Sequence, residues 1–386
     1  MNFAFTEEQH ELRATARAFL ADACKPEAVR AAMASALGYD EKLWAQIGGE
    51  LGWTAVVVPE RCGGLGLSWV ELVALQEVIG ESLAPSPFFA SVCLAANAIL
   101  AAGDAAQHEA LLPGIAEGRT RAALALAEAS GRWDADGIAA TCERSGDGYL
   151  LRGEKRYVVD GASADLLVLA AREPGSRGAA GVSLFALPAS SAGLAREAVP
   201  TLDPTRRLAT LRFDSVWVPA SARLGADGSA WPALELALQR AAVALAAEQL
   251  GGAQRTLELA VAYAKERVQF GRTIGSFQAL KHKLADVMVK VEAARSAVYY
   301  AACVAAGGLA GPASGDGALA AAASMAKAAA TEAFSLAAGS ALQVFGGVGF
   351  TWEYDVHLYF KRARSSATLL GDASWHRELV ARAIGL

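Results

Sequence analysis

The fold of this chain is decided by residues 277–298, which read FQALKHKLADVMVKVEAARSAV. Apolar side chains recur there in alternating steps of three and four residues, at Phe277, Leu280, Leu284, Val287, Val291, Ala294 and Val298. This spacing predicts a long helix that packs along one seam. The helical period extends from Trp231 to the last residue and predicts a four-helix bundle. We expect its helices over 231–265, 275–305 and 318–344, with a short pair after Tyr354.

The preceding segment, from about residue 120 to 226, has a different pattern. Short runs rich in β-branched and aromatic residues are separated by Gly, Asp and Pro, which predicts strands. The expected strands cover Gly148–Val159 around a turn-like Arg152–Gly153 pair, Asp165–Ala170, Val182–Leu187 and Leu211–Val218. Because the segment lacks the crossovers of about 12 residues that parallel strands need, we expect an antiparallel, β-barrel-like domain and no Rossmann domain.

The N-terminal segment predicts a helical bundle. Thr6 and Gln9 have the spacing of a capping box, and the helical face that follows carries Leu12, Ala16, Phe19 and Leu20. A glycine-rich loop over 63–66 precedes a second apolar helical run over 70–79. We therefore predict a mainly α chain with a central β-domain. The expected domains are 1–118, 119–228 and 229–386.

Composition narrows the class of protein. The chain has 54% hydrophobic and 19% charged residues and a net charge of -5, with no Lys/Arg cluster that could follow a phosphate backbone, so no nucleic-acid partner is expected. Five dispersed cysteines without a CxxC pair, and an N-terminus without a signal-peptide pattern, predict a reduced, cytoplasmic protein. Lys327 and Glu332 interrupt the apolar stretch 318–345, which favours a buried helix over a membrane span. Metal-ligand spacings are absent, so no metal site is expected.

Two segments of the C-terminal bundle have the residue types of a phosphate-binding site. The first reads RVQFGR over 267–272, and an arginine there can make forked, charge-assisted contacts to phosphate. The second reads QVFGGVGF over 343–350, and its glycines allow a left-handed backbone and a close approach of amides to an anion. Either segment alone also fits an ordinary solvated helix end. Together, about 75 residues apart, they favour a cofactor site.

With the order helical bundle, β-domain, helical bundle, these motifs make the chain resemble the acyl-CoA dehydrogenase family of FAD-binding tetramers. The resemblance implies that the first segment holds the FAD pyrophosphate and adenosine through Arg267, Gln269, Phe270, Phe277 and Gln278. It implies that the second contacts the cofactor diphosphate of a neighbouring subunit through Gln343, Val344, Phe345, Gly346 and Gly347. It also implies an acyl-CoA substrate and electron transfer to an electron-transfer flavoprotein.

The expected flavin platform on the β-domain departs from the family pattern. AEAS at 127–130 stands where relatives have Thr-Glu-Pro-Gly, and KRYVVDG at 155–161 stands where they have Lys-x-Trp-Ile-Thr-Asn-Gly. The resemblance assigns cofactor contacts to Glu128, Tyr157 and Val159, but valine lacks the hydroxyl that hydrogen-bonds near flavin N5 in relatives. Tyr157 can still stack against the flavin as the usual tryptophan does. We therefore expect weak or absent flavin binding at this platform.

The catalytic base of the family is missing at both of its usual positions. In relatives a glutamate removes the α-proton of the thioester while a hydride leaves to the flavin. The C-terminal position, aligned through Gly371 and Arg377, is Leu370, and the alternative position is Ala241 or Ala242. The catalytic residue therefore stays unassigned.

Three other residues offer acid–base chemistry near those positions. Asp372 is a candidate base, with helix capping as the plainer interpretation. Glu248 lies about two helical turns, roughly 10 Å, from Ala241 and is more simply a partner for Arg255 or a subunit contact. His376 can titrate near neutrality, but at a helix start it is more simply a surface or interface histidine.

This combination resembles the heteromeric acyl-CoA dehydrogenases of bacterial steroid side-chain degradation, in which two different family chains form a tetramer with FAD only at interfaces between unlike chains. Our hypothesis is that this chain is the subunit without the base, in an enzyme that dehydrogenates a bulky acyl-CoA between its α and β carbons. Two alternatives stay open. One is a homotetramer with an atypical base, Asp372 first. The other is a non-catalytic subunit that binds acyl-CoA or serves as a scaffold.

Overall fold

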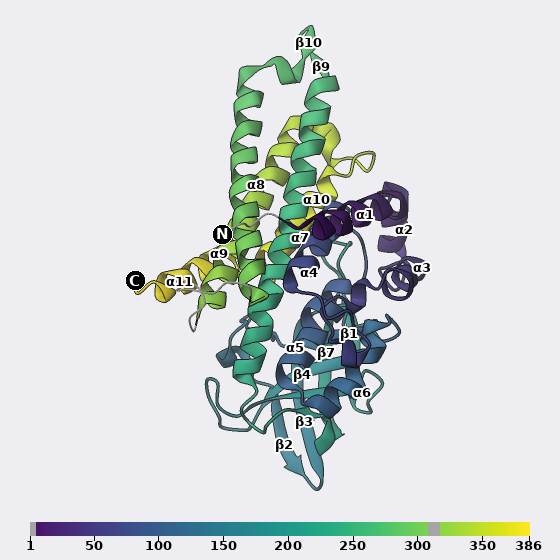
Figure 1. Ribbon diagram of the computed structural model, residues 1–386, viewed down its shortest axis with the longest axis vertical. Helices are drawn as coiled ribbons and strands as arrows, with labels where there is room; N and C mark the ends of the chain where they lie inside the picture. Colours follow the sequence, from purple (N-terminus) through teal and green to yellow (C-terminus); the bar gives the residue numbers. More distant parts are fainter. Residues whose placement is uncertain (1–4, 308–316) are drawn as a thin grey trace. The chain divides into compact units, whose positions relative to one another are not determined.

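The computed structural model describes residues 5–307 and 317–386 (Figure 1). Residues 1–4, which were part of the N-terminal stretch used for the localisation prediction, lie outside the described residues. The chain divides into two compact units. The first comprises Met1–Ala31, Ser68–Ala84 and Ala242–Leu386, and the second comprises Ala32–Leu67 and Pro85–Ala241.

The first unit is helical. Its helices are α1 (Glu7–Ala23), α4 (Trp69–Glu81), most of α7 (Trp231–Glu266), α8 (Gln278–Ala305), α9 (Ala318–Phe345), α10 (Val356–Thr368) and α11 (Ala373–Ala383), and it shares α2 (Pro26–Ala34) with the second unit. The predicted C-terminal helices are therefore confirmed. The start of α8 was predicted too early, because Ile274–Ser276 forms a separate 3-10 turn ahead of it.

The seam on α8 explains how the long helices pair. Val287, Val291, Ala294 and Val298 are buried along it, whereas Leu280 and Leu284, nearer the start of the helix, are only partly buried. α7 and α8 run side by side as two long ribbons joined at one end (Figure 1). A hydrogen bond also links the two helices, because the Arg295 guanidinium of α8 donates to Gln254 Oε1 of α7 at 2.9 Å.

Helix α9 packs as a core helix. Within the described residues it belongs to the one helical run, Ala318–Phe350, that is long and apolar enough to cross a membrane by length and composition. However, α9 packs against α8, α10 and α11 and buries Lys327 completely. A buried cation held by hydrogen bonds is expected in a protein core, so the prediction of a buried helix agrees with the packing.

Side-chain caps set the starts of two helices in this unit. Thr6 Oγ1 accepts from the Gln9 amide at 3.3 Å and the Gln9 side chain accepts from the Thr6 amide at 3.0 Å, which is the predicted capping box of α1. Ser68 and Glu71 form the same motif at the start of α4, directly after the glycine-rich loop.

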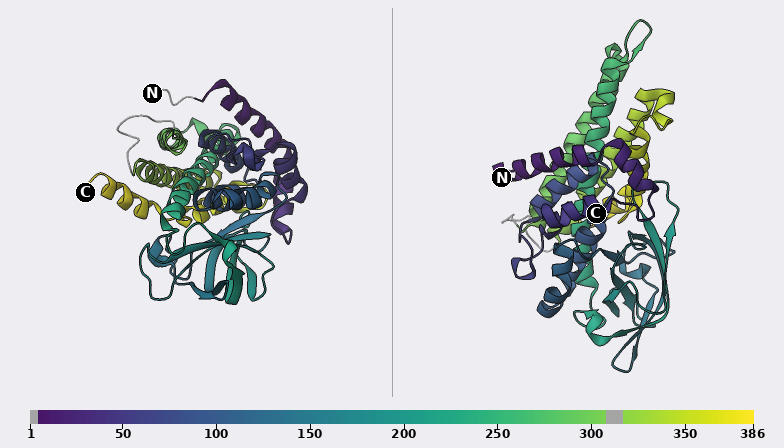
Figure 2. Two further views of the ribbon diagram at one scale, coloured as in Figure 1. Left: turned by 60° about the horizontal axis from the view of Figure 1, so that its bottom comes forward. Right: turned by 90° about the vertical axis from the view of Figure 1, so that its right-hand side faces the viewer.

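The second unit is built on one sheet of eight strands, seen from two sides in Figure 2. The strands are β1 (Ala122–Ala125), β2 (Thr141–Ser145), β3 (Gly148–Val159), β4 (Leu166–Arg172), β5 (Val182–Pro188), β6 (Leu194–Val199), β7 (Leu208–Pro219) and β8 (Arg223–Leu224). Their order is β6-β7-β3-β2-β4-β5-β8, with β1 on β4. The unit also contains α3 (Glu41–Ala45), α5 (Asn97–Ala102), α6 (Ala105–Ala116) and two π-helical turns at Gln46–Glu50 and Phe89–Ala96.

Two expectations for the β-domain were wrong. The sheet is mixed and not antiparallel, because β1 pairs with β4 in parallel. A tight hairpin can join only antiparallel strands, but the connection from β1 to β4 is long enough for the chain to return and pair in parallel. The Arg152–Gly153 pair is not a turn. It lies inside β3 at a shift of register against β7, where Gly153 has a φ of 138° and an added Cβ would lie 2.8 Å from the Ala140 Cα.

Candidate cofactor site

The first predicted cofactor segment forms the exposed hairpin that joins α7 to α8. Strands β9 (Val268–Gln269) and β10 (Arg272–Thr273) pair around a two-residue turn whose residues, Phe270 and Gly271, both have positive φ. That geometry is typical of a type I′ hairpin. The Phe270 side chain is 90% exposed and the Arg272 guanidinium lies 4.2 Å from the centre of the Phe277 ring. The hairpin thus presents aromatic and cationic groups together.

The second predicted segment ends α9 and continues as a 3-10 turn over Gly346–Phe350. Gly346 has φ 65° and ψ -144°, a region that residues with a Cβ avoid. Among the described residues, no atom other than those of the adjacent residues lies within 4 Å of the position that a Cβ would take at Gly346 or Gly347. Glycine is therefore needed for the backbone angle at Gly346, and the open space beside both residues leaves room for an anion against the backbone.

One hydrophobic cluster brings the two segments together. Tyr263 of α7 stacks on Phe345 of α9 with ring centres 4.1 Å apart, and Ile274 packs against the same cluster. Lys283 Nζ donates to Gln343 Oε1 across the helices. Sequence reasoning missed Lys283, which had no signal beyond being one of several lysines on α8.

Val344 and Phe345 contribute to this site in a different way from the other predicted residues. Their side chains are buried in the cluster, so only their backbone could touch a cofactor. By contrast, the side chains of Arg267, Gln269 and Gln278 are exposed. Exposed guanidinium groups, open backbone at two glycines and exposed aromatic rings fit the diphosphate and adenosine of FAD.

The β-domain carries the predicted flavin platform at a second bulge of β3. The pairing with β7 shifts between Lys155 and Val158, and Tyr157 takes a φ of 58° there. A positive φ at a tyrosine is uncommon and stores strain, and bulges commonly re-aim a side chain. Tyr157 is 43% exposed, whereas Val159 is buried at 2%. The platform therefore presents an aromatic ring but no hydroxyl from residue 159.

Glu128 has a structural role in the same domain. Its Oε1 atom accepts hydrogen bonds from the amides of Ala139 and Ala140, both at 2.9 Å, and from Lys155 Nζ at 2.6 Å. Lys155 is fully buried and also donates to the Leu126 carbonyl. Burial lowers the pKa of Lys155 to about 8, although the nearby carboxylate opposes the shift. The ion pair thus ties the segment after β1, which carries Glu128, to β3 just before the bulge that carries Tyr157.

The residues predicted to stand at the family's two base positions are all buried and apolar. Leu370 is buried with a φ of 60°, and Ala241 and Ala242 are buried in α7. The turn around Leu370 is nevertheless firmly held. Lys327 Nζ donates to the Ser366 and Gly371 carbonyls at 3.1 and 3.2 Å.

Asp372 and Glu248, two of the alternative bases, each make a structural contact with another part of the chain. Asp372 caps α11 by accepting from the Trp375 amide at 2.8 Å, as the plainer interpretation predicted. The predicted partner of Glu248 was wrong. Glu248 is buried and pairs with Arg362 at 2.9 Å, while Arg255 pairs with Glu258. Partners on different helices, 114 residues apart, leave no local pattern in the sequence.

The prediction that His376 lies at a surface or interface was wrong, because α11 packs this residue against α9. It is 3% exposed, with Nδ1 at 3.2 Å from Ser324 Oγ and Nε2 at 3.0 Å from the Leu370 carbonyl oxygen. Burial, with a further contribution from Lys327, lowers the pKa of His376 to about 4. The imidazole is therefore neutral at pH 7 and occupied by structural contacts.

Three family models cover the chain almost from end to end. They describe the N-terminal, middle and C-terminal domains of acyl-CoA dehydrogenases and match residues 6–119, 123–216 and 228–385. Together with the helix–sheet–helix order, these matches define a class of oxidoreductase. The chain belongs to the acyl-CoA dehydrogenase family, which confirms the predicted fold and the enzyme class.

Relatives of this chain include a bacterial acyl-CoA dehydrogenase and chains of two complexes, one of which is described as a steroid enzyme. It is 38% identical to the acyl-CoA dehydrogenase IpdE2 of Mycobacterium tuberculosis, covering 94% of this chain and 93% of the relative. A chain of the ChsE4-ChsE5 complex from Mycobacterium tuberculosis superposes with a TM-score of 0.88 at 26% identity, covering 100% of this chain and 99% of that one. A variant of the Tcur3481-Tcur3483 steroid ACAD superposes with a TM-score of 0.85 at 34% identity, covering 98% of each chain.

Proposed function

We propose that this chain is the subunit without the base in a heteromeric, FAD-dependent acyl-CoA dehydrogenase. In that enzyme a second chain of the family supplies the glutamate and this chain completes the cofactor site. The observation that carries the proposal is the buried, apolar character of Leu370 and Ala241. A leucine and an alanine have no atom that can accept the α-proton of a thioester.

The contacts of the three substitute bases support the same proposal. An Asp372 carboxylate that leaves the Trp375 amide would uncap α11, and a Glu248 carboxylate that leaves Arg362 would break a buried ion pair. His376 is held through both ring nitrogens. None of the three is available without dismantling a structural contact.

The part that this chain contributes is the diphosphate half of the site. Arg267, Arg272 and the backbone at Gly346 and Gly347 would hold the FAD diphosphate, and Phe270 or Phe277 would face the adenine. FAD supplies the hydride acceptor when it is bound. Val159 offers no hydroxyl to the flavin ring, so the chain's own platform would bind it weakly.

Partners follow from the same proposal. The ChsE4-ChsE5 and Tcur3481-Tcur3483 names each pair two different proteins, which supports a mixed tetramer for this chain. We infer a bulky, steroid-like acyl-CoA as substrate and an electron-transfer flavoprotein as electron acceptor.

The absence of disulfides among the five cysteines supports a reduced, cytoplasmic setting. The proposed domain borders remain 1–118, 119–228 and 229–386.

The test is acyl-CoA oxidation with a dye as electron acceptor. The chain alone should show no turnover above background, and coexpression with a second family chain should produce it. Replacing the partner's base glutamate with glutamine should abolish turnover of the mixed enzyme, whereas Asp372→Asn in this chain should leave it nearly unchanged. Normal turnover by the chain alone would overturn the proposal.

A further inference from the structure

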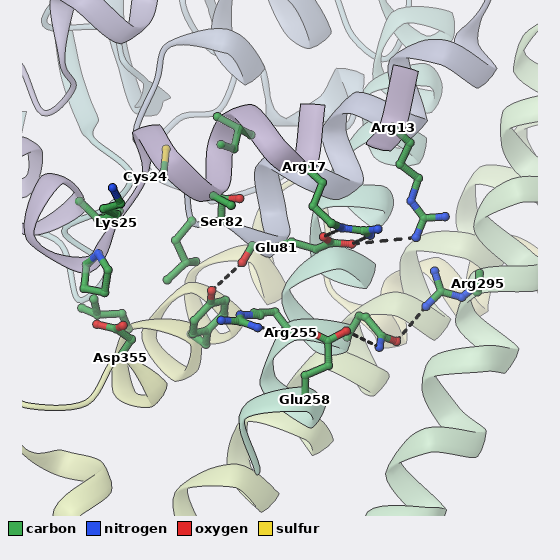
Figure 3. A pocket seen from close by; sticks show the side chains of 18 of the residues that line it. Arg13, Arg17, Cys24, Lys25, Glu81, Ser82, Arg255, Glu258, Arg295 and Asp355 are labelled. Atoms are coloured by element: carbon green, nitrogen blue, oxygen red, sulfur yellow. Dashed lines mark hydrogen bonds and ion pairs between the residues drawn. The ribbon is translucent and has the colours of Figure 1, made fainter. Parts of the chain in front are cut away.

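Cationic side chains of the first unit differ in whether a carboxylate of the chain neutralises them. A cavity of about 630 Å³ lies between α1, α2, the end of α4, α7, α8 and α10 (Figure 3). Each cation that lines it has a carboxylate partner, as Arg17 has in Glu81 through hydrogen bonds of 2.7 and 2.6 Å. By contrast, Arg267, Arg272 and Lys283 of the candidate cofactor site form no ion pair within residues 5–307 and 317–386. Unpaired cations of one sign attract an anion, so the structure favours the cofactor site for one.

Lys283 reaches from α8 across to the end of α9. Its Nζ atom donates to Gln343 Oε1. The nearest acidic residue on α8 is Asp286, three positions further on, where two side chains of a helix can meet. Lys283 nevertheless makes no ion pair with Asp286 in the part of the chain that the structure describes. The lysine therefore contacts the neighbouring helix and not its own.

The contact with Lys283 determines which end of the Gln343 amide is free. A side-chain amide has an acceptor oxygen at one end and an NH2 donor at the other, whereas an ammonium group only donates. Lys283 must therefore bind Oε1, which leaves Nε2 as the free end. Gln343 is exposed, and its Nε2 atom has no hydrogen-bond partner among the described residues. Two N–H donors are thus available to a ligand.

Gln343 stands where those donors can meet an anion at the glycine-rich turn. It lies three positions before Gly346, at which α9 ends, and residues three apart share one face of a helix. The backbone of Gly346 and Gly347 borders open space on the side that a Cβ would take. An anion in that space would be bound by the NH2 group of Gln343, but it would be repelled by the amide oxygen if the amide were reversed.

We propose that Lys283 is a positioning residue of the cofactor site, which turns the NH2 group of Gln343 toward the diphosphate of the bound dinucleotide. The inference rests on the proposed function, in which this chain supplies the diphosphate half of the site. Lys283 acts through Gln343, because the lysine holds the amide oxygen and the glutamine provides the donors. Without Lys283 the amide could rotate and present either end to the anion.

The experiment measures the Kd of ADP by isothermal titration calorimetry on the full-length chain purified alone. ADP has the adenosine and diphosphate of FAD but no flavin ring, so its binding does not depend on the flavin platform or on a second chain. Lys283→Met should weaken ADP binding about tenfold, since it frees the amide of Gln343. Lys283→Arg should stay within about twofold of the parent, because a guanidinium also only donates.

Two further variants separate positioning from simple loss of charge. Lys281→Met removes the same charge two positions earlier, on a different face of α8, and should leave the Kd within about twofold of the parent. Gln343→Met should weaken binding about as much as Lys283→Met, and the double variant should be no weaker than either single variant.

The outcomes distinguish this inference from the proposed function. If the parent binds ADP and Lys283→Met binds it equally well, Lys283 has no part in the site, while the diphosphate half stands. Additive losses in the double variant, or an equal loss in Lys281→Met, would show that the lysine acts only as a charge and would also overturn the positioning role. A parent chain that binds no ADP would remove the diphosphate half itself, and this inference with it.

Discussion

Lys327 and Gly371 are joined by a hydrogen bond of 3.2 Å from the buried ammonium to the backbone carbonyl. The bond ties α9 to the turn that carries Leu370. The turn at the proposed base position is thus held by hydrogen bonds from a buried lysine, although Leu370 has no carboxylate. On the proposed assignment of Leu370 to a base position, the backbone there is kept in place while the side chain is apolar.

Replacing Lys327 should destabilise the protein strongly. Lys327→Met removes the donor to two carbonyls and to Thr331 Oγ1, so three hydrogen bonds in the core are lost. We expect a loss of about 3 kcal/mol in the free energy of unfolding, measured by urea denaturation. Lys281→Met, on an exposed residue of α8, should stay within about 0.5 kcal/mol of the parent. Equal stabilities of the two variants would contradict the role given to Lys327.

His376 should make stability fall in mild acid. Its folded pKa of about 4 lies below the ordinary value of 6.5, so the unfolded state binds the proton more readily. The neutral imidazole of His376 therefore contributes to the free energy of unfolding in full above pH 6.5. This contribution, on the order of 3 kcal/mol, is lost as the pH falls toward 4. Unfolding measured from pH 7 to pH 4 should show this slope.

Variants separate His376 from other acid effects. His376→Gln should flatten the slope between pH 6.5 and 4, whereas His282→Gln, on an exposed residue of α8, should preserve it. If the His376→Gln protein retained the parent's slope, the histidine would not be the titrating group.

The contact between α4 and α7 should be intolerant of a single methyl group. A Cβ at Gly251 would lie 1.8 Å from the Glu77 carbonyl oxygen, so Gly251→Ala must force the helices apart, at about 3 kcal/mol. Gly339 provides the control inside α9, because in the described part of the chain only the neighbouring backbone of α9 itself comes within 4 Å of its Cβ position. Gly339→Ala should stabilise by about 0.5–1 kcal/mol. If thermal unfolding showed Gly251→Ala to be more stable than Gly339→Ala, the close contact between α4 and α7 would be refuted.

The Lys155–Glu128 ion pair should behave as a coupled unit. Lys155→Met leaves the Glu128 carboxylate buried at 8% exposure with only two amide donors, and should cost about 3–5 kcal/mol. Adding Glu128→Gln should recover part of that loss, because it removes the stranded charge. A double-mutant cycle by urea unfolding measures the coupling, and strictly additive losses would argue against it.

Local patterns in the sequence predicted much of the fold. The seam on α8 and the Thr6 capping box depend on residues three or four positions apart, which a sequence displays directly. The strand β3 was predicted with its observed bounds, but its bulges were not, because a bulge depends on the register of the partner strand.

Contacts between distant segments account for what the sequence did not predict. The parallel pairing of β1 with β4 and the Glu248–Arg362 ion pair join segments far apart in the chain. The burial of His376 depends on α9 covering α11. The resemblance to the family placed apolar residues at the expected base positions, whereas the contacts that occupy Asp372 and Glu248 required the structure.

The central claim is that this chain completes a flavin site only beside a different chain of its family. The most direct measurement is the flavin-to-protein ratio from the visible spectrum, with the native mass of the same sample, for the chain purified alone and after coexpression with a second family chain. The account predicts a colourless preparation alone and a yellow tetramer containing both chains. A yellow homotetramer of this chain alone would contradict it.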